Sequence, residues 1–206
     1  MRKISREFEN PIDNVLIDCA DFLNKYFYKL GFNANGLTTI SLIFTLLSLY
    51  TFYTEQYKLS GTFFMLRYLF DCCDGHFART YNNVTVFGDI YDHFNDYFGF
   101  LAILYLMYKK SPRTLLLVLP LIIVQIFMLN IHTGCQEKMY NSPITGMLTF
   151  LKNFCPDAKL ISVTKYFGCG TISTFIALLA FFYPNIMNFI NNNKTLSEFN
   201  LFGTFA

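Results

Sequence analysis

The chain has 206 residues, of which 53% are hydrophobic and only 15% are charged, with a formal net charge of +2. Soluble domains carry about 25% charged residues, so this composition is typical of a membrane protein. The small net charge and the absence of a long basic run exclude a nucleic-acid-binding surface. Six cysteines occur without a C-x-x-C pair. We therefore expect buried free thiols and neither a zinc site nor a disulfide scaffold.

The N-terminal region predicts an amphipathic helix. Residues 11–30 repeat apolar side chains at helical spacing, with Pro11 suited to the first turn and Gly31 to the stop. A helix of this kind lies on a membrane surface. We expect residues 1–30 to form this interfacial segment, residues 31–192 a transmembrane catalytic domain, and residues 193–206 a polar C-terminal tail.

Apolar segments follow that are long enough to cross a bilayer, which needs about 20 residues. The expected spans are Leu37–Thr54, residues 59–79, residues 84–108, Thr114–Ile131 and residues 167–190. Residues 140–166 are ambiguous, because prolines and charged residues interrupt their apolar pattern. The sequence therefore predicts an all-α membrane bundle of about six transmembrane helices, preceded by the interfacial helix. Basic residues before the first span favour a cytoplasmic N-terminus, and the turn at residues 80–83 would then face the cytoplasm too.

One short stretch of this apolar chain is rich in carboxylates. Residues 71–96, DCCDGHFARTYNNVTVFGDIYDHFND, include Asp71, Asp74, Asp92 and Asp96. Each ionised aspartate at the centre of a membrane helix costs about 2.5–3.5 kcal/mol. Four of them need compensation by water, counter-charges or metal.

The spacing of these aspartates predicts that they meet. The first two share one helix face with Ala78, and the last two share a face of the next helix with Gly88. A short turn joins the two helices as an antiparallel pair, so the acidic faces converge near one end. Small residues on both faces allow the backbones to approach closely and leave room for a ligand.

A cluster of carboxylate oxygens suits two Mg²⁺ or Mn²⁺ ions, with positions left open for phosphate oxygens. Such a site is typical of phosphoryl transfer, and Asp96 is the natural candidate for the general base. Pairing of the aspartates with Arg67, Arg79 or Lys165 is the structural alternative. It explains neither the small residues nor the matched spacing.

The stretch resembles the signature of the CDP-alcohol phosphotransferases, D-x2-D-G-x2-A-R-x8-G-x3-D-x3-D. All eight fixed positions are filled, by Asp71, Asp74, Gly75, Ala78, Arg79, Gly88, Asp92 and Asp96. The segment ANGLT at residues 34–38 is similar to the P-N-x-[IL]-T of this family, with Ala34 in place of proline.

This resemblance implies a six-helix membrane enzyme of phospholipid biosynthesis, usually a homodimer, whose polar cavity opens to the cytoplasm. It implies that Asp71, Asp74 and Asp92 bind metal and that Asp96 is both a shared ligand and the catalytic base. The CDP part would lie along small and polar residues, namely Gly75, Ala78, Arg79 and Gly88, with Asn35 and Thr38 as further contacts. An acceptor hydroxyl would attack the β-phosphorus directly and CMP would leave.

The sequence leaves the identity of the alcohol open. His76, Asn82, Thr85 and Phe87 are similar to phosphatidylinositol synthases, whereas the YDHFND segment is similar to choline/ethanolamine phosphotransferases. The short chain favours CDP-diacylglycerol as donor. The alternatives are transfer from CDP-choline or CDP-ethanolamine to diacylglycerol, a membrane prenyltransferase, or a cation channel.

Overall fold

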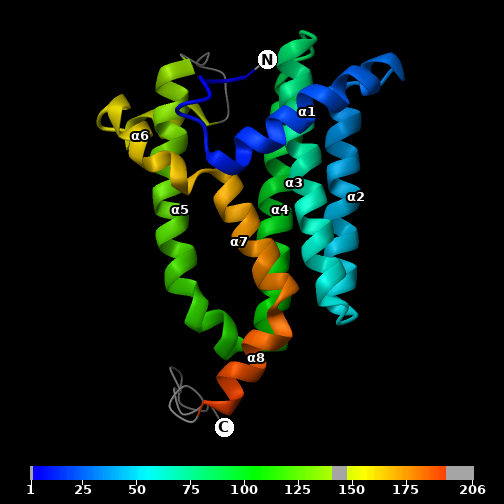
Figure 1. The fold of residues 1–206 in the computed structure, drawn as a ribbon, viewed down its shortest axis with the longest axis vertical. Helices are drawn as coiled ribbons and strands as arrows, with labels where there is room; N and C mark the ends of the chain where they lie inside the picture. Colours follow the sequence, from blue (N-terminus) through cyan, green and yellow to red (C-terminus); the bar gives the residue numbers. More distant parts are fainter. Residues whose placement is uncertain (1, 141–147, 194–206) are drawn as a thin grey trace.

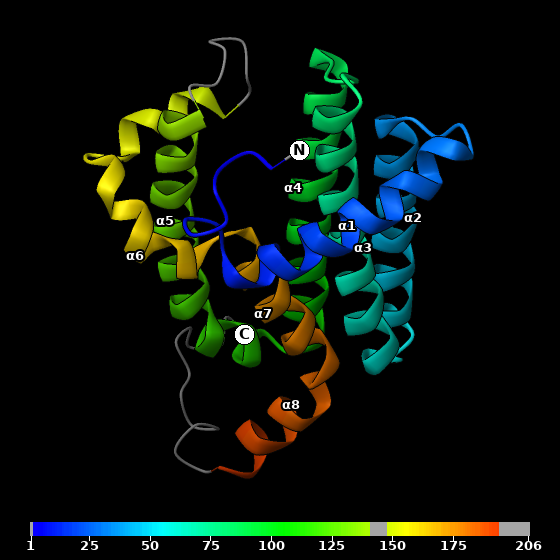
Figure 2. The same ribbon diagram turned by 45° about the horizontal axis from the view of Figure 1, so that its top comes forward.

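The computed structural model describes residues 2–140 and 148–193, and the regular secondary structure of these residues is entirely helical (Figure 1). The long helices α2 to α5 run alternately up and down, α7 descends beside them, and α1 crosses one end of the bundle. Seen from the tilted view of Figure 2, α1 lies across α3 towards α2. The predicted all-α class is confirmed.

Helix α1 (Pro11–Lys29) begins and ends where its sequence signals predict. The Asn10 side chain accepts hydrogen bonds from the backbone N–H groups of Ile12 and Asp13, at 2.9 and 3.4 Å, and Pro11 opens the first turn. Gly31 follows the helix with a positive φ of 80°, a conformation that glycine adopts without strain. The position of α1 on a membrane surface stays a prediction.

The expected antiparallel pair is formed by α3 (Tyr57–Thr80) and α4 (Val86–Lys110). Between them, Asn82 adopts a positive φ of 53°, which asparagine tolerates better than most residues. Thr85 then caps α4 by accepting a hydrogen bond from the Gly88 backbone N–H at 3.0 Å. The turn therefore lies where the sequence places it.

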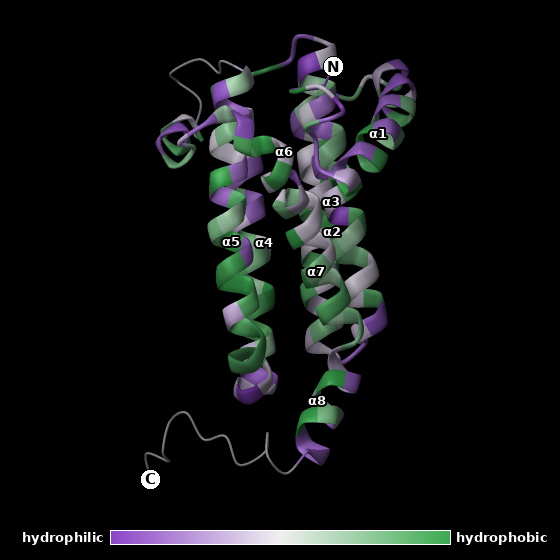
Figure 3. Ribbon diagram, turned by 60° about the vertical axis from the view of Figure 1, so that its left-hand side comes forward, coloured by the Kyte–Doolittle hydropathy of each residue, from purple (hydrophilic) through white to green (hydrophobic). Residues whose placement is uncertain are grey.

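Three segments of the described chain are long and apolar enough to cross a membrane: α2 (Ala34–Tyr53), α5 (Pro112–Tyr140), and the run Ala158–Phe181, which ends in α7 (Cys169–Phe181). Helices α3 and α4 run beside them with 24 and 25 residues, but they carry the aspartates and are less apolar. Figure 3 shows hydrophilic residues gathered at the end of the bundle near α1. The further spans of the predicted six stay a prediction.

The ambiguous residues 140–166 form no long helix where the structure describes them. Residues 141–147 lie outside the described residues, as does the tail from residue 194. From residue 148 onward the chain forms short helices and then turns into α7 and α8 (Tyr183–Asn192). The short helices are η1 (Thr149–Phe154), η2 (Ala158–Leu160), α6 (Ile161–Thr164) and η3 (Lys165–Phe167).

The expectation that all six cysteines are free thiols is wrong for one pair. Cys135, in the last turns of α5, forms a disulfide with Cys155, which follows η1, with their Cα atoms 5.1 Å apart. The chain folds back along the end of α5 after residue 148, and this return brings together two cysteines separated by 20 residues. No spacing motif in the sequence predicts such a contact. Cys19, Cys72, Cys73 and Cys169 are free.

The segment before α1 ties this helix to α5. Arg2 forms an ion pair with Asp18 of α1 at 2.5 Å, whereas Lys3 forms one with Glu137 of α5. Gln136 donates a hydrogen bond to Glu9 at 3.0 Å. Residues 2–10 therefore close one side of the bundle at the end where the α3–α4 turn lies (Figure 1).

Candidate active site

The acidic faces of α3 and α4 meet inside the bundle. Asp71, Asp92 and Asp96 each offer a carboxylate oxygen, and these oxygens all lie within 4.8 Å of one another. The helical spacing of the aspartates and the antiparallel turn produce this convergence, since each pair lies on one face of its helix. Three carboxylates at such distances repel one another strongly unless cations lie among them.

Several of these oxygens have no hydrogen-bond partner within the described chain. Oδ1 of Asp71, Oδ2 of Asp74 and Oδ1 of Asp92 are buried and unpartnered. Buried polar atoms are almost always paired, and leaving one unpaired costs about 1–3 kcal/mol, more for a charged group. The cluster therefore has the hard-oxygen donor set and the unmet bonding capacity that a divalent cation satisfies.

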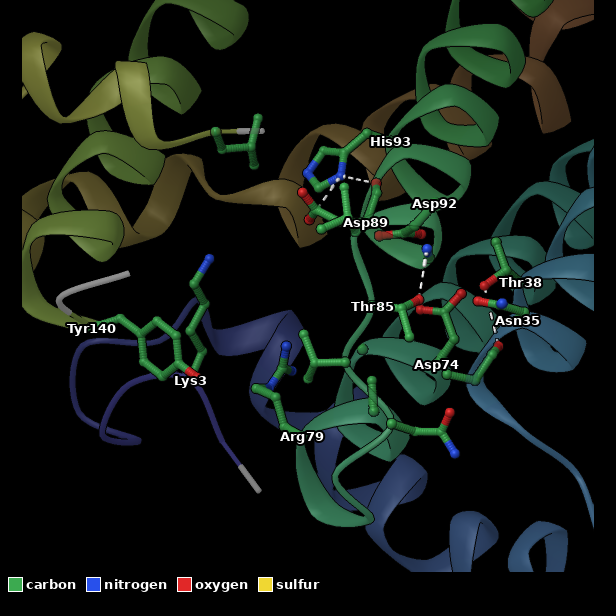
Figure 4. A pocket seen from close by; sticks show the side chains of 18 of the residues that line it. Lys3, Asn35, Thr38, Asp74, Arg79, Thr85, Asp89, Asp92, His93 and Tyr140 are labelled. Atoms are coloured by element: carbon green, nitrogen blue, oxygen red, sulfur yellow. Dashed lines mark hydrogen bonds and ion pairs between the residues drawn. The ribbon is translucent and has the colours of Figure 1, made fainter. Parts of the chain in front are cut away.

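A cavity of about 420 Å³ opens in front of the aspartates. Asp74 and Asp92 line it, whereas Asp71 and Asp96 are not among its lining residues. All the residues expected to contact the CDP part line this cavity, namely Asn35, Thr38, Gly75, Ala78, Arg79 and Gly88. In Figure 4, Asn35 and Thr38 of α2 stand beside Asp74 and Asp92, and Arg79 lies farther along α3. The cavity volume is in the range of small-molecule sites.

Two signature glycines of this stretch lie against polar side chains. A Cβ at Gly88 would lie 2.9 Å from the Asn35 Oδ1 and 3.0 Å from the Thr85 Oγ1, so a larger residue here would displace these two side-chain ends. A Cβ at Gly75 would lie 3.3 Å from the Arg79 Nη1, so the guanidinium folds back over the bare backbone at this position. Both glycines therefore shape the cavity wall.

Buried polar contacts hold α2 against α4 beside the cluster. Asn95, next to Asp96 in the chain, is fully buried and donates to the Ser41 Oγ at 3.0 Å. It accepts from the Thr45 Oγ1 at 3.1 Å. Such interhelical hydrogen bonds fix the register of helices within a membrane. The rotation of α4 that aims its aspartates at α3 is thus set by α2.

Arg67 belongs to the site, although from the sequence it was considered only as a possible counter-charge for the aspartates. Its guanidinium, 4% exposed, forms an ion pair with Asp96 and lies 5.2 Å from the centre of the Phe64 ring. A Cβ at Gly99 would lie 3.2 Å from the Arg67 Nε, so this glycine makes room for the arginine. A signal was present, because Arg67 lies one turn before Asp71 on the same helix face.

Further residues of the cavity wall were not predicted. Asp89 and His93 line it, and the His93 Nδ1 lies 2.6 Å from the Asp89 carbonyl oxygen (Figure 4). Lys3 and Tyr140 lie on the opposite side of the cavity (Figure 4), which Glu137 also lines. The other histidine of the motif, His76, points away from the cavity; its Nδ1 lies 3.2 Å from the Asn24 Nδ2 in the contact between α1 and α3.

The fold and this cluster define an α-helical membrane protein with a cavity that is lined by carboxylates from two of its helices. The family model of the CDP-alcohol phosphatidyltransferases matches residues 32–197, which include the whole α3–α4 pair. The chain belongs to the CDP-alcohol phosphatidyltransferase family. No curated protein and no solved structure matches it.

Proposed function

We propose that the chain transfers a phosphoalcohol group from a CDP-alcohol, in the first instance CDP-diacylglycerol, to the hydroxyl of an acceptor alcohol, with release of CMP. One observation carries this proposal. Carboxylates from two helices converge with unpartnered oxygens behind a cavity that is lined by the six residues expected to contact the CDP part. Membership of the family supports the same chemistry.

The residues present fit divalent metal ions. Asp71, Asp92 and Asp96 offer oxygens within 4.8 Å of one another, and Asp74 presents a further unpartnered oxygen. We propose that these four side chains hold two Mg²⁺ or Mn²⁺ ions, because hard carboxylate oxygens suit both metals. When bound, such ions polarise the pyrophosphate and neutralise charge on the departing phosphate.

The remaining steps of the reaction are assigned to side chains of the protein. The acceptor hydroxyl attacks the β-phosphorus, a new P–O bond forms, the bond from this phosphorus to the bridging oxygen breaks, and CMP leaves with the electron pair. Asp96 takes the proton of the attacking hydroxyl, and Arg67 holds this carboxylate in place. Arg79, folded over Gly75 in the cavity wall, places a positive charge near the anionic nucleotide.

We propose that the cavity opens to the cytoplasm. Basic residues are concentrated at the end of the bundle that carries α1 and the α3–α4 turn, namely Arg2, Lys3, Arg6, Lys25, Lys29, Arg79, Lys138, Lys152, Lys159 and Lys165. In the described chain the opposite end has Lys58, Lys109, Lys110 and Arg113. Excess lysine and arginine on one side marks the cytoplasmic side. The homodimer implied by the family resemblance stays a prediction.

The test is CMP release by the purified protein in detergent with Mg²⁺. CDP-diacylglycerol is offered with serine, choline, ethanolamine, inositol and glycerol 3-phosphate, and CDP-choline and CDP-ethanolamine are offered with diacylglycerol. We expect CMP from one of these pairs and loss of CMP release on addition of EDTA. Absence of CMP with every donor would refute the proposal. Formation of CMP from one donor class only would decide between CDP-diacylglycerol and the choline/ethanolamine alternative.

The role of Asp96 is tested in the same assay. We expect Asp96→Asn to abolish turnover while it largely preserves binding of the nucleotide, which is measured by equilibrium dialysis with CDP. Asp21→Asn is the matched control, because Asp21 is an exposed carboxylate that pairs with Lys25 at 3.2 Å on α1. Equal loss of turnover and of CDP binding in Asp96→Asn would mean that another carboxylate is the base.

A further inference from the structure

On the α5 side, the wall of the cavity includes the ammonium group of Lys3. Lys3 forms an ion pair with Glu137, whose side chain is only 4% exposed, and its Nζ lies 5.7 Å from the centre of the Tyr140 ring. Glu137 and Tyr140 are three residues apart in the last turn of α5, so they share one helix face. All three residues line the same cavity as Asp74 and Asp92, and Figure 4 shows Lys3 and Tyr140 there.

A buried carboxylate beside an aromatic ring face is a binding site for alkylammonium ions. The ring attracts the cation through its quadrupole, and the carboxylate supplies the opposite charge. A carboxylate as buried as Glu137 is strongly unfavourable without a counter-charge. The carboxylate and the ring together therefore favour a cation at this position, whether it belongs to Lys3 or to a ligand.

The same wall is poorly suited to an anionic headgroup. Among the described residues, the lysine and arginine side chains that line the cavity are Lys3 and Arg79, and His93 lies on α4 away from this wall. Lys3 is already paired with Glu137. The lysines of the α5 end and of the short helices that follow are not among the lining residues; Lys138 donates to the Cys155 carbonyl oxygen and Lys165 to that of Glu7. A phosphorylated alcohol would therefore meet a carboxylate and no spare cation on this side.

The position of Lys3 allows its side chain to move away from Glu137. It belongs to the irregular segment before α1, and its side chain is 25% exposed. The neighbours Arg2 and Arg6 both pair with Asp18, at 2.5 and 2.8 Å. These pairs anchor the backbone of the segment on α1 independently of Glu137, so the lysine can swing out while the segment stays in place.

We propose that Glu137 and Tyr140 form a subsite for the positively charged end of an alkylammonium alcohol, and that Lys3 occupies this subsite until the alcohol displaces it. The inference rests on the proposed function, since it names the class of alcohol that the enzyme handles. It holds whether this alcohol arrives free as the acceptor or as part of the CDP donor.

The experiment measures binding without any nucleotide, so that it is independent of turnover. Equilibrium dialysis with radiolabelled choline is performed on the purified protein, with tetramethylammonium and inositol as competitors. We expect tetramethylammonium to compete and inositol not to compete. Lys3→Met should tighten choline binding about tenfold, because the tethered competitor is removed, and Tyr140→Leu should weaken it several-fold. Glu137→Gln should weaken it by at least about tenfold.

Further variants separate loss of the subsite from a general loss of stability. The double variant Lys3→Met/Glu137→Gln removes both charges of the pair, so it leaves no buried unpaired charge, and it should not bind choline. The matched control is the exposed pair Lys110–Glu55 at the other end of the bundle, where Lys110→Met and Glu55→Gln should leave choline binding unchanged.

The inference is overturned if choline fails to bind the wild-type chain, if inositol competes as well as tetramethylammonium, or if choline binding is the same in Lys3→Met and Glu137→Gln as in the wild type. Failure of the proposed function is a different result, namely no CMP from any CDP-alcohol donor. Choline binding with the expected response to these variants, but without CMP release, would support the subsite and refute the proposed reaction.

Discussion

The ion pair between Arg67 and Asp96 offers the sharpest test of the cluster, and Arg67→Met is the substitution that isolates it. Methionine retains an apolar side chain against Phe64 and removes the guanidinium charge, which lies beside three carboxylates. We expect three changes together: a lower stability, a tighter hold on divalent metal and a slower turnover. No defect of folding alone produces this combination.

The magnitudes follow from the burial and charge of the pair. Loss of one partner from a fully buried ion pair costs about 3–5 kcal/mol, but the Asp96 side chain is 39% exposed, so we expect a loss of about 2–3 kcal/mol in the free energy of unfolding. At an effective dielectric constant of about 20, unit charges roughly 8 Å apart interact by ~2 kcal/mol. Removing the guanidinium should therefore lower the Mg²⁺ concentration at half-maximal activity by at least about thirtyfold, because a divalent ion carries two such charges. Loss of the orientation of Asp96 should lower kcat roughly a hundredfold.

The assay is CMP release as a function of Mg²⁺ concentration, with the melting temperature measured on the same preparation. Arg67→Lys retains the charge and should keep a Mg²⁺ requirement close to that of the wild type. The control is Arg113→Met, which removes an exposed arginine at the start of α5. A Mg²⁺ requirement that is unchanged or higher in Arg67→Met would show that Arg67 neither competes with the metal nor positions Asp96.

Three further outcomes follow from the structure. Gly88→Ala should raise KM for the CDP donor about tenfold in CMP-release kinetics, because the added Cβ would lie 2.9 Å from the Asn35 Oδ1 and displace this side chain in the cavity wall; an unchanged KM would contradict this contact. Replacement of Cys135 and Cys155 by serine should lower stability by about 3 kcal/mol, given the 20-residue separation, and a reductant should lower the melting temperature of the wild type but not of the variant. Burial raises the pKa of Asp13 from 3.8 to about 7 despite the hydrogen bond from Tyr68, so the protonated form is favoured in the folded chain. Stability should therefore be greatest below about pH 4 and decrease as the pH rises to about 7, by up to about 4 kcal/mol, and Asp13→Asn should flatten this profile of melting temperature against pH.

The parts of the fold that depend on local sequence were predictable. The ends of α1 follow from Pro11 and Gly31, and the turn at Asn82 follows from a run of polar residues between two apolar segments. The convergence of the aspartates was predictable for the same reason, because helical spacing fixes the face on which each carboxylate lies.

The parts that depend on the course of the chain in space were not predictable. The contact of Lys3 with Glu137 joins residues 134 apart in the sequence, and the disulfide of Cys135 requires the chain to fold back through residues that lack a strong helical pattern. For Arg67 the face was visible in the sequence. Its pairing with Asp96 depends on the space that Gly99 leaves and on the rotation of α4.

In the proposed site, charge balance accounts for a buried arginine beside the aspartates. Four ionised aspartates would carry four negative charges, and the pyrophosphate of a CDP-alcohol would add two more. The two proposed divalent ions would supply four positive charges, and Arg67 and Arg79 the remaining two, so the loaded site would be neutral. In the structure Arg67 pairs with Asp96, whereas oxygens of Asp71, Asp74 and Asp92 have no hydrogen-bond partner among the described residues. In the proposed mechanism the arginine thus stabilises the carboxylate of the general base, while the other three carboxylates stay available for the ions.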